Sequence, residues 1–159
     1  MLFRSLPKSS NEDPRFDLET NVGHTLNLLE SARRNAVESI VFVSSGGTVY
    51  GRPEATPIPE SHPTNPLCAQ GISKLAIEKY LHLYWKLHGL DYCVLRVSNA
   101  YGGRERTEKA QGAVAVLLDR ALKGEVFEIW GDGSVVRDYV YVTDVIRALA
   151  RAAGYDGEE

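Results

Sequence analysis

The sequence predicts an α/β domain with a parallel sheet, on three observations. Segments with helical periodicity alternate along the chain with short apolar runs. The first of those runs, Ile40–Val43, is apolar on both faces, which is typical of a buried parallel strand. The length of 159 residues, of which 43% are hydrophobic and 25% charged, suits one soluble domain with a single core and excludes a complete large two-domain enzyme.

The chain is expected to begin with an irregular lead-in over residues 1–16, which contains Pro7 and Pro14 and shows no period. A helix is expected from Asp17 to about Asn35, because apolar residues recur there at steps of three and four. These residues are Leu18, Val22, Leu26, Leu29, Ala32 and Ala36.

The strand at Ile40–Val43 is followed by a long loop, a second helix and a second strand. Five prolines between Pro53 and Pro66 exclude a helix or central strand there. Loops of this length in compact domains are usually functional or disordered. A helix is predicted from about Cys68 to His88 and is terminated by Gly89, and the next strand covers Tyr92–Val97.

The C-terminal third repeats the alternation with shorter elements. A Gly-rich loop at Asn99–Gly103 precedes a helix at Ala113–Leu122, which ends at Gly124. A strand is expected at Val126–Trp130, and residues 131–133 form a turn.

The last elements complete the predicted domain. Asp138–Val142 is expected to be extended, and Thr143 can cap a final helix that runs to Ala153. We therefore predict one domain over residues 17–153 and a short tail at 154–159.

Composition and charge exclude several classes of partner. The net charge is −3 and the basic residues form no run, so no nucleic-acid partner is expected. Cys68 and Cys93 have neither metal-ligand spacing nor the density of a disulfide scaffold, so we expect no metal and a reducing compartment. We find no signal peptide and no apolar stretch of ~18–20 residues, which predicts a cytoplasmic protein without a membrane partner.

Small hydroxylic residues follow the first predicted strand, at Ser44, Ser45 and Thr48. In open parallel sheets, ligands bind beyond the carboxyl ends of the strands, where small side chains allow close approach. A simple Ser/Gly turn explains the same residues.

Three polar side chains further along the chain are candidates for ligand binding. Gln70 and Lys74 lie one helical turn apart on the same face, where the lysine could bind ribose hydroxyls. Arg137 offers a guanidinium fork that suits a diphosphate. The ordinary alternatives are a solvated surface lysine and an arginine that pairs with Asp138 or Asp132.

These signals occur in an order that resembles the NAD-dependent sugar-nucleotide epimerase/dehydratase family of extended short-chain dehydrogenases. The resemblance covers about residues 12–153 and is strongest to epimerases that act on UDP-glucose. The motifs are Ser44–Gly51, Pro57–Glu60, Gly71–Tyr80, Leu95–Asn99, and Gly131–Gly133 with Arg137–Tyr139 and Asp144.

The resemblance implies a Rossmann-like doubly wound sheet, here partial, with part of the small substrate-binding region. It implies NAD as cofactor, a nucleotide sugar such as UDP-glucose as substrate, and 4-epimerisation by hydride transfer through a 4-keto intermediate. It assigns NAD contacts to Asn21, Ser44, Ser45, Lys74 and Ser98. It assigns diphosphate and nucleotide contacts to Asn99, Gly112, Ala113 and Arg137.

Three departures from the family pattern bear on activity. Gln70 stands where the family has its catalytic tyrosine, and an amide does not titrate as a phenol does. Gly46 replaces a hydroxyl residue, which leaves Thr48 to orient the sugar and makes Thr48, Gln70 and Lys74 the catalytic candidates. The sequence contains no Gly-x-x-Gly-x-x-Gly turn for the cofactor pyrophosphate, so the chain resembles the middle of the family.

Two functions remain open at this stage. One is an epimerase represented by a partial chain, impaired or inactive as it stands. The other is a non-catalytic remnant or binding domain for a nucleotide sugar or a partner chain. In both cases we expect an exposed sheet edge near Ile40–Val43, which favours a homodimer or other self-association.

Overall fold

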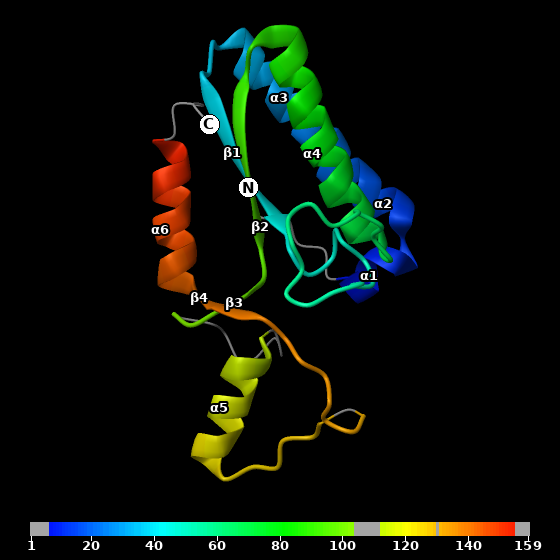
Figure 1. The fold of residues 1–159 in the computed structure, drawn as a ribbon, viewed down its shortest axis with the longest axis vertical. Coiled ribbons are helices and arrows are strands. Elements are labelled where there is room, and N and C mark those ends of the chain that lie inside the picture. Colours follow the sequence, from blue (N-terminus) through cyan, green and yellow to red (C-terminus); the bar gives the residue numbers. More distant parts are fainter. Residues whose placement is uncertain (1–6, 104–111, 130, 155–159) are drawn as a thin grey trace. The chain divides into compact units, whose positions relative to one another are not determined.

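The computed structural model describes residues 7–103, 112–129 and 131–154, and it divides the chain into two compact units. Unit 1 comprises Met1–Arg96 with Leu149–Glu159, and unit 2 comprises Val97–Ala148. Figure 1 traces both units along the chain. Helices alternate with strands as predicted, which confirms the α/β class.

The predicted irregular lead-in is wrong for most of its described part. Two short helices, α1 (Pro7–Glu12) and α2 (Pro14–Leu18), occupy this segment. The Asp13 side chain caps α2 by accepting a hydrogen bond from the Phe16 amide, and Pro14 takes the first helical position, which requires no amide hydrogen. Pro7 and Pro14 therefore do not exclude regular structure here, because each stands at the first position of a helix.

The predicted helix over Asp17–Asn35 is interrupted by a π-helical turn, η1 (Glu19–Gly23), before α3 (His24–Arg34). The wider turn rotates the buried face relative to a regular helix. Leu18 is consequently 50% exposed, whereas the polar side chains of Asp17 and Asn21 are buried. Ala36 adopts a positive φ of 51° and lies beyond the end of the helix.

The centre of unit 1 agrees with the predictions. Strand β1 (Ser39–Ser45) is followed by an irregular segment, then by α4 (Ala69–His88) and β2 (Asp91–Val97), which pairs with β1. Gly89 ends α4 with a left-handed φ of 67°, as its position predicted.

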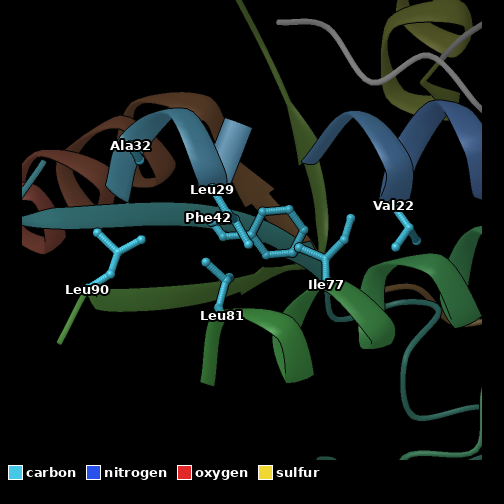
Figure 2. Packing of buried hydrophobic residues seen from close by; sticks show 7 residues of the cluster. All are labelled: Val22, Leu29, Ala32, Phe42, Ile77, Leu81 and Leu90. Atoms are coloured by element: carbon cyan, nitrogen blue, oxygen red, sulfur yellow. The ribbon is translucent and has the colours of Figure 1, made fainter. Parts of the chain in front are cut away.

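The core of unit 1 forms where α3 and α4 pack on β1. Leu29 from α3, Phe42 from β1, and Ile77 and Leu81 from α4 point toward one another in Figure 2. Leu29, Ile77 and Leu81 are almost fully buried. This apolar packing attaches α4 to the sheet, and it thereby fixes the polar side chains that the same helix carries near the carboxyl end of β1.

Unit 2 contains a small parallel sheet, in which β3 (Asn99–Tyr101) pairs with β4 (Tyr139–Tyr141). The expectation of a loop at Asn99–Gly103 is thus wrong for the part that forms β3. Helix α5 (Ala113–Lys123) matches its prediction and ends at Gly124, which has a φ of 67°.

Two further predictions in this part need correction. Residues 126–129 form no regular structure, so the predicted strand at Val126–Trp130 is wrong there, and Trp130 lies outside the described residues. The last helix, α6 (Val142–Ala153), includes Thr143 in its first turn, so Thr143 does not precede it as a cap. Among the described helices, none has the length and apolar character needed to span a bilayer.

Candidate functional site

The start of α4 carries the segment with Gln70 and Lys74, and it is held by side chains from α1. The backbone amide of Ala69 donates to Asn11 Oδ1 at 2.8 Å, and that of Gln70 donates to Ser10 Oγ at 3.1 Å. Cys68, the residue at the N-cap position, provides no such bond itself. Two orphan amides of the helix are therefore satisfied by residues almost 60 positions earlier, and α1 helps to place this segment.

Lys74 reaches from the first turns of α4 to the carboxyl end of β1. Its Nζ donates a hydrogen bond to the Val43 carbonyl oxygen at 2.7 Å and lies 4.7 Å from the centre of the Phe42 ring. Burial lowers the pKa of Lys74, and the negative charges of Asp17 and Glu78 partly oppose that shift. The ammonium is thus a fixed cation at a strand end.

Glu78 lies one turn after Lys74 and forms the centre of a buried polar cluster. Its Oε1 accepts a hydrogen bond from Ser44 Oγ at 2.5 Å, and its Oε2 lies 2.6 Å from Nη2 of Arg96 on β2. Arg96 Nε also donates to Oε1, at 3.2 Å, which makes the ion pair two-pronged. The hydrogen bonds that Arg96 donates to Glu78 raise the pKa of the Arg96 guanidinium, so this group remains charged.

Arg96 connects this cluster to the proline-rich loop. Its Nη1 donates to the Tyr50 hydroxyl at 2.9 Å, and its guanidinium lies 4.9 Å from the centre of the Tyr50 ring. His62 packs edge-on against the same ring, accepts a hydrogen bond from the Glu54 amide at 3.1 Å, and bonds through Nδ1 to the Pro63 carbonyl. Because that carbonyl can only accept, Nδ1 carries the hydrogen.

A second buried polar cluster lies beneath α4. Asp17 accepts a hydrogen bond from Ser73 Oγ at 2.7 Å and another from Asn21 Nδ2 at 2.9 Å. The Asn21 carbonyl in turn accepts from Thr25 Oγ1. This cluster joins α2 and η1 to α4 at the residue next to Lys74, and it engages the amide group of Asn21, which the sequence assigned to NAD.

Thr48 lies in the turn after β1. Its Oγ1 is buried, and no hydrogen-bond partner for it lies in the described part of the chain. A Cβ at Gly71 would come within 2.6 Å of the Thr48 carbonyl oxygen, so glycine permits the close approach of α4 to this turn. The Ser45 carbonyl accepts from the Val49 amide at 3.3 Å and closes the turn.

The other predicted residues belong to unit 2. Asn99 donates to the Asp138 carbonyl through both its backbone amide, at 3.2 Å, and its side-chain amide, at 2.8 Å. Ser98 directly precedes β3, Gly112 precedes α5 with a φ of 92°, and Ala113 is the first residue of that helix. Arg137 is exposed, and its Nη1 contacts the carbonyl of its neighbour Val136 at 3.3 Å.

The structure therefore brings Ser44, Lys74 and Asn21 into the polar clusters of unit 1 and places the proposed diphosphate ligands in unit 2. The sequence analysis missed Asp17, Ser73, Glu78 and Arg96 as partners of these residues. Glu78 was the one with a local signal, because it follows Lys74 by four positions on a predicted helix.

The fold of unit 1 is that of an α/β protein with parallel strands, a class in which ligands approach the carboxyl ends of strands. The profile of the "NAD dependent epimerase/dehydratase family" matches residues 2–158. The chain belongs to this family.

Similar proteins support the same assignment. The UDP-glucose 4-epimerase of Mycolicibacterium smegmatis is 43% identical over 150 residues, which are 94% of this chain and 48% of that protein. The crystal structure of UDP-glucose 4-epimerase from Thermotoga maritima, with UDP-glucose, matches with a TM-score of 0.89 and 39% identity over 93% of this chain and 48% of that one.

A third relative is the UDP-glucose 4-epimerase of Thermus thermophilus, solved in complex with NAD. It matches with a TM-score of 0.84 and 41% identity over 94% of this chain and 50% of that one. These likenesses confirm the predicted partial Rossmann-like fold with parallel strands. They also show that the chain spans about half the length of the relatives that it matches.

Proposed function

We propose that this chain is part of an NAD-dependent sugar-nucleotide epimerase that acts on UDP-glucose and UDP-galactose. The observation that carries the proposal is Lys74, whose ammonium is held on the Val43 carbonyl at the carboxyl end of β1. A fixed cation at this place suits ribose hydroxyls of a dinucleotide. NAD supplies the hydride acceptor for this chemistry.

The residues around the end of β1 fit the nicotinamide side of such a cofactor. Lys74 provides the cation, Ser45 lies at the end of the strand, and Thr48 lies in the turn that follows, with its hydroxyl oxygen buried. Ser44 and Asn21 act here through the hydrogen bonds that they make to Glu78 and Asp17, respectively. Ser98, which precedes β3, completes the proposed set of NAD-binding residues.

Proton transfer is the step for which this chain is poorly equipped. Gln70 occupies the position of the family's tyrosine, and a neutral amide neither takes nor returns a proton near neutral pH. We therefore propose that the chain has impaired or no epimerase activity by itself, and that Thr48 and Lys74 retain substrate- and cofactor-orienting roles.

The substrate side of the proposal rests on unit 2. Arg137 and Asn99 supply the groups for a diphosphate, and Gly112 with Ala113 supplies the start of α5 for the nucleotide. The Arg137 side chain is exposed and therefore accessible to a ligand. If UDP binding survives without turnover, the chain acts as a nucleotide-sugar-binding domain, which is the second candidate function.

Self-association and a cytoplasmic location complete the proposal. Val43 on β1 is 40% exposed, so pairing of this sheet edge with a second copy would cover apolar surface. Sedimentation at rising concentration tests this, and a monomer throughout would contradict it. The free thiols of Cys68 and Cys93 suit the cytoplasm.

The proposal is tested with a chimera in which the N-terminal half of the Thermus thermophilus relative precedes this chain. We expect Gln70→Tyr to raise epimerisation of UDP-galactose in the chimera and to leave the chain alone inactive. Equal activity of the chimera with Gln70 and with Tyr would remove the assigned role of position 70. Calorimetry with NAD is expected to show no low-micromolar binding to the chain alone, and such binding would contradict the placement of the cofactor site.

A further inference from the structure

The polar cluster around Glu78 connects two segments that sequence motifs treat as separate. The first is the end of β1, where Lys74 and Ser44 lie. The second is the proline-rich loop that begins after Tyr50. Glu78 contacts the first through Ser44, and Arg96 contacts the second through Tyr50.

The contacts to β1 come in a matched pair. Lys74 and Glu78, one turn apart on α4, hold two consecutive residues of the strand: Lys74 bonds the Val43 carbonyl at 2.7 Å, and Glu78 accepts from the Ser44 hydroxyl. This arrangement fixes how α4 lies along β1. A shift of the helix by one residue would break both contacts.

The contacts to the loop begin at Arg96, which bonds both carboxylate oxygens of Glu78. Arg96 bonds Glu78 at 2.6 Å and Tyr50 at 2.9 Å, and the Tyr50 ring packs against His62. Two backbone amides of the loop are bonded to this series of residues. The Glu54 amide donates to His62, and the Asn65 amide donates to the Tyr50 carbonyl. A loop with five prolines is thus attached at its start and near its end.

Because the ion pair between Glu78 and Arg96 is largely buried, removal of either side chain is expected to be destabilising. The Glu78 side chain is 8% exposed and that of Arg96 is 25% exposed. Loss of one partner leaves the other charge poorly solvated and unpaired. The surface ion pair between Glu30 and Arg33 on α3 is 37% and 41% exposed and faces no such cost.

We propose that Glu78 and Arg96 are positioning residues that anchor two segments of the site on one buried ion pair: the end of β1, which Lys74 of α4 contacts, and the proline-rich loop. Their role in cofactor placement rests on the proposed function. The anchoring itself does not rest on the proposed function, and it can be measured in the ligand-free chain.

Hydrogen exchange of single amides in the full chain tests the anchoring of each segment. Tyr50→Phe removes only the hydroxyl that Arg96 bonds, and we expect exchange at Glu54 and Asn65 to become about threefold to tenfold faster, while the Val49 amide in the turn after β1 is unchanged. Ser44→Ala should accelerate exchange at the Val49 amide and leave exchange at Glu54 and Asn65 unchanged. Glu78→Gln should accelerate all three amides, and the amide of Leu81 in α4 serves as the reference for global opening.

A second measurement separates positioning from simple stability. The pKa of Lys74 is followed by NMR of its ε-carbon. In Glu78→Gln this pKa should fall further, because the negative charge of Glu78, which raises it, is lost. Glu78→Asp keeps the charge but shortens the reach, so it should preserve that pKa and still accelerate the loop amides. Glu19→Gln, which breaks the exposed ion pair with Arg15, is the surface control and should change neither.

Two results would overturn the proposal. One is unchanged exchange at Glu54 and Asn65 in Tyr50→Phe. The other is acceleration of every amide, that of Leu81 included, by the same factor in the single-hydroxyl variants. Both variants lack only one oxygen atom, so they remain informative if Glu78→Gln fails to fold. Absence of UDP binding would defeat the nucleotide-sugar-binding part of the proposed function without changing the exchange result.

Discussion

The residues of unit 1 that are predicted to bind the cofactor differ from Arg137, the predicted diphosphate ligand of unit 2, in how their side chains are held. In unit 1, Lys74, Ser44 and Asn21 bond to residues on other helices or strands or to buried carboxylates. In unit 2, Arg137 bonds the backbone of its own neighbour and is exposed.

This difference separates a preorganised region from one that a ligand must order. Side chains locked by partners lose little entropy when a ligand binds, whereas immobilising a surface arginine costs about 0.5–1.5 kcal/mol. The cofactor side of the proposed site is therefore built into the fold of unit 1. On the diphosphate side, the Arg137 side chain would become ordered only when it contacts the ligand.

The largest contrast is expected in stability. Leu81→Ala in the core of unit 1 should lower the free energy of unfolding by about 2–5 kcal/mol, because it opens a cavity among Leu29, Phe42 and Ile77. Val136→Ala in unit 2 removes a side chain that is 87% exposed and should change it by less than about 0.5 kcal/mol. Urea unfolding measures both free energies of unfolding. Equal losses in the two variants would contradict the difference between the two units.

The next effect concerns the substrate side. Arg137→Ala should weaken UDP binding about tenfold to a hundredfold, since a two-pronged arginine–phosphate contact is charge-assisted. Arg137→Lys should restore little, because an ammonium is a point charge. Calorimetry with UDP measures this, with Arg147→Ala as control, an exposed arginine paired with Asp144.

Equal UDP affinity of the parent chain and Arg137→Ala would remove Arg137 from the site. Its side chain would then be an exposed surface group that bonds the backbone of its neighbour and plays no part in binding.

A smaller effect is expected where α1 holds α4. Ser10→Ala removes the oxygen that accepts from the Gln70 amide and should lower the free energy of unfolding by about 0.5–2 kcal/mol, as the loss of a helix cap does. Ser134→Ala, which alters a local turn with Asp132 in unit 2, is the matched control and should have almost no effect. Thermal melts that rank the two variants the other way would contradict the role of Ser10.

The smallest effect is a dependence of stability on pH. Burial lowers the pKa of Lys74 below 10.5 in the folded chain, so between that pKa and 10.5 the unfolded chain binds more protons. The parent chain should therefore gain stability relative to Lys74→Met as the pH rises through this window. Paired urea titrations from about pH 8 to about pH 11 measure the difference, and a constant difference would indicate an unperturbed lysine.

Local patterns were sufficient for the elements whose signals lie within a few residues. Periodicity and the terminal Gly89 predicted α4, and apolar β-branched runs predicted β1 and β2. The same approach was wrong at residues 126–129, where a short apolar run forms no strand. Apolar runs of this length become strands only when a neighbouring strand satisfies their backbone.

By itself, the sequence determined the α/β class, the order of most elements, the positions of Lys74 and Gln70 on one helix face, and the likeness to a family. Tertiary structure alone decided which polar groups meet. Ser44 and Glu78 are 34 positions apart, Tyr50 and Arg96 are 46 apart, and Gln70 and Ser10 are 60 apart. No local period relates such pairs, because they come together only when apolar packing of α3 and α4 on β1 has brought distant segments side by side.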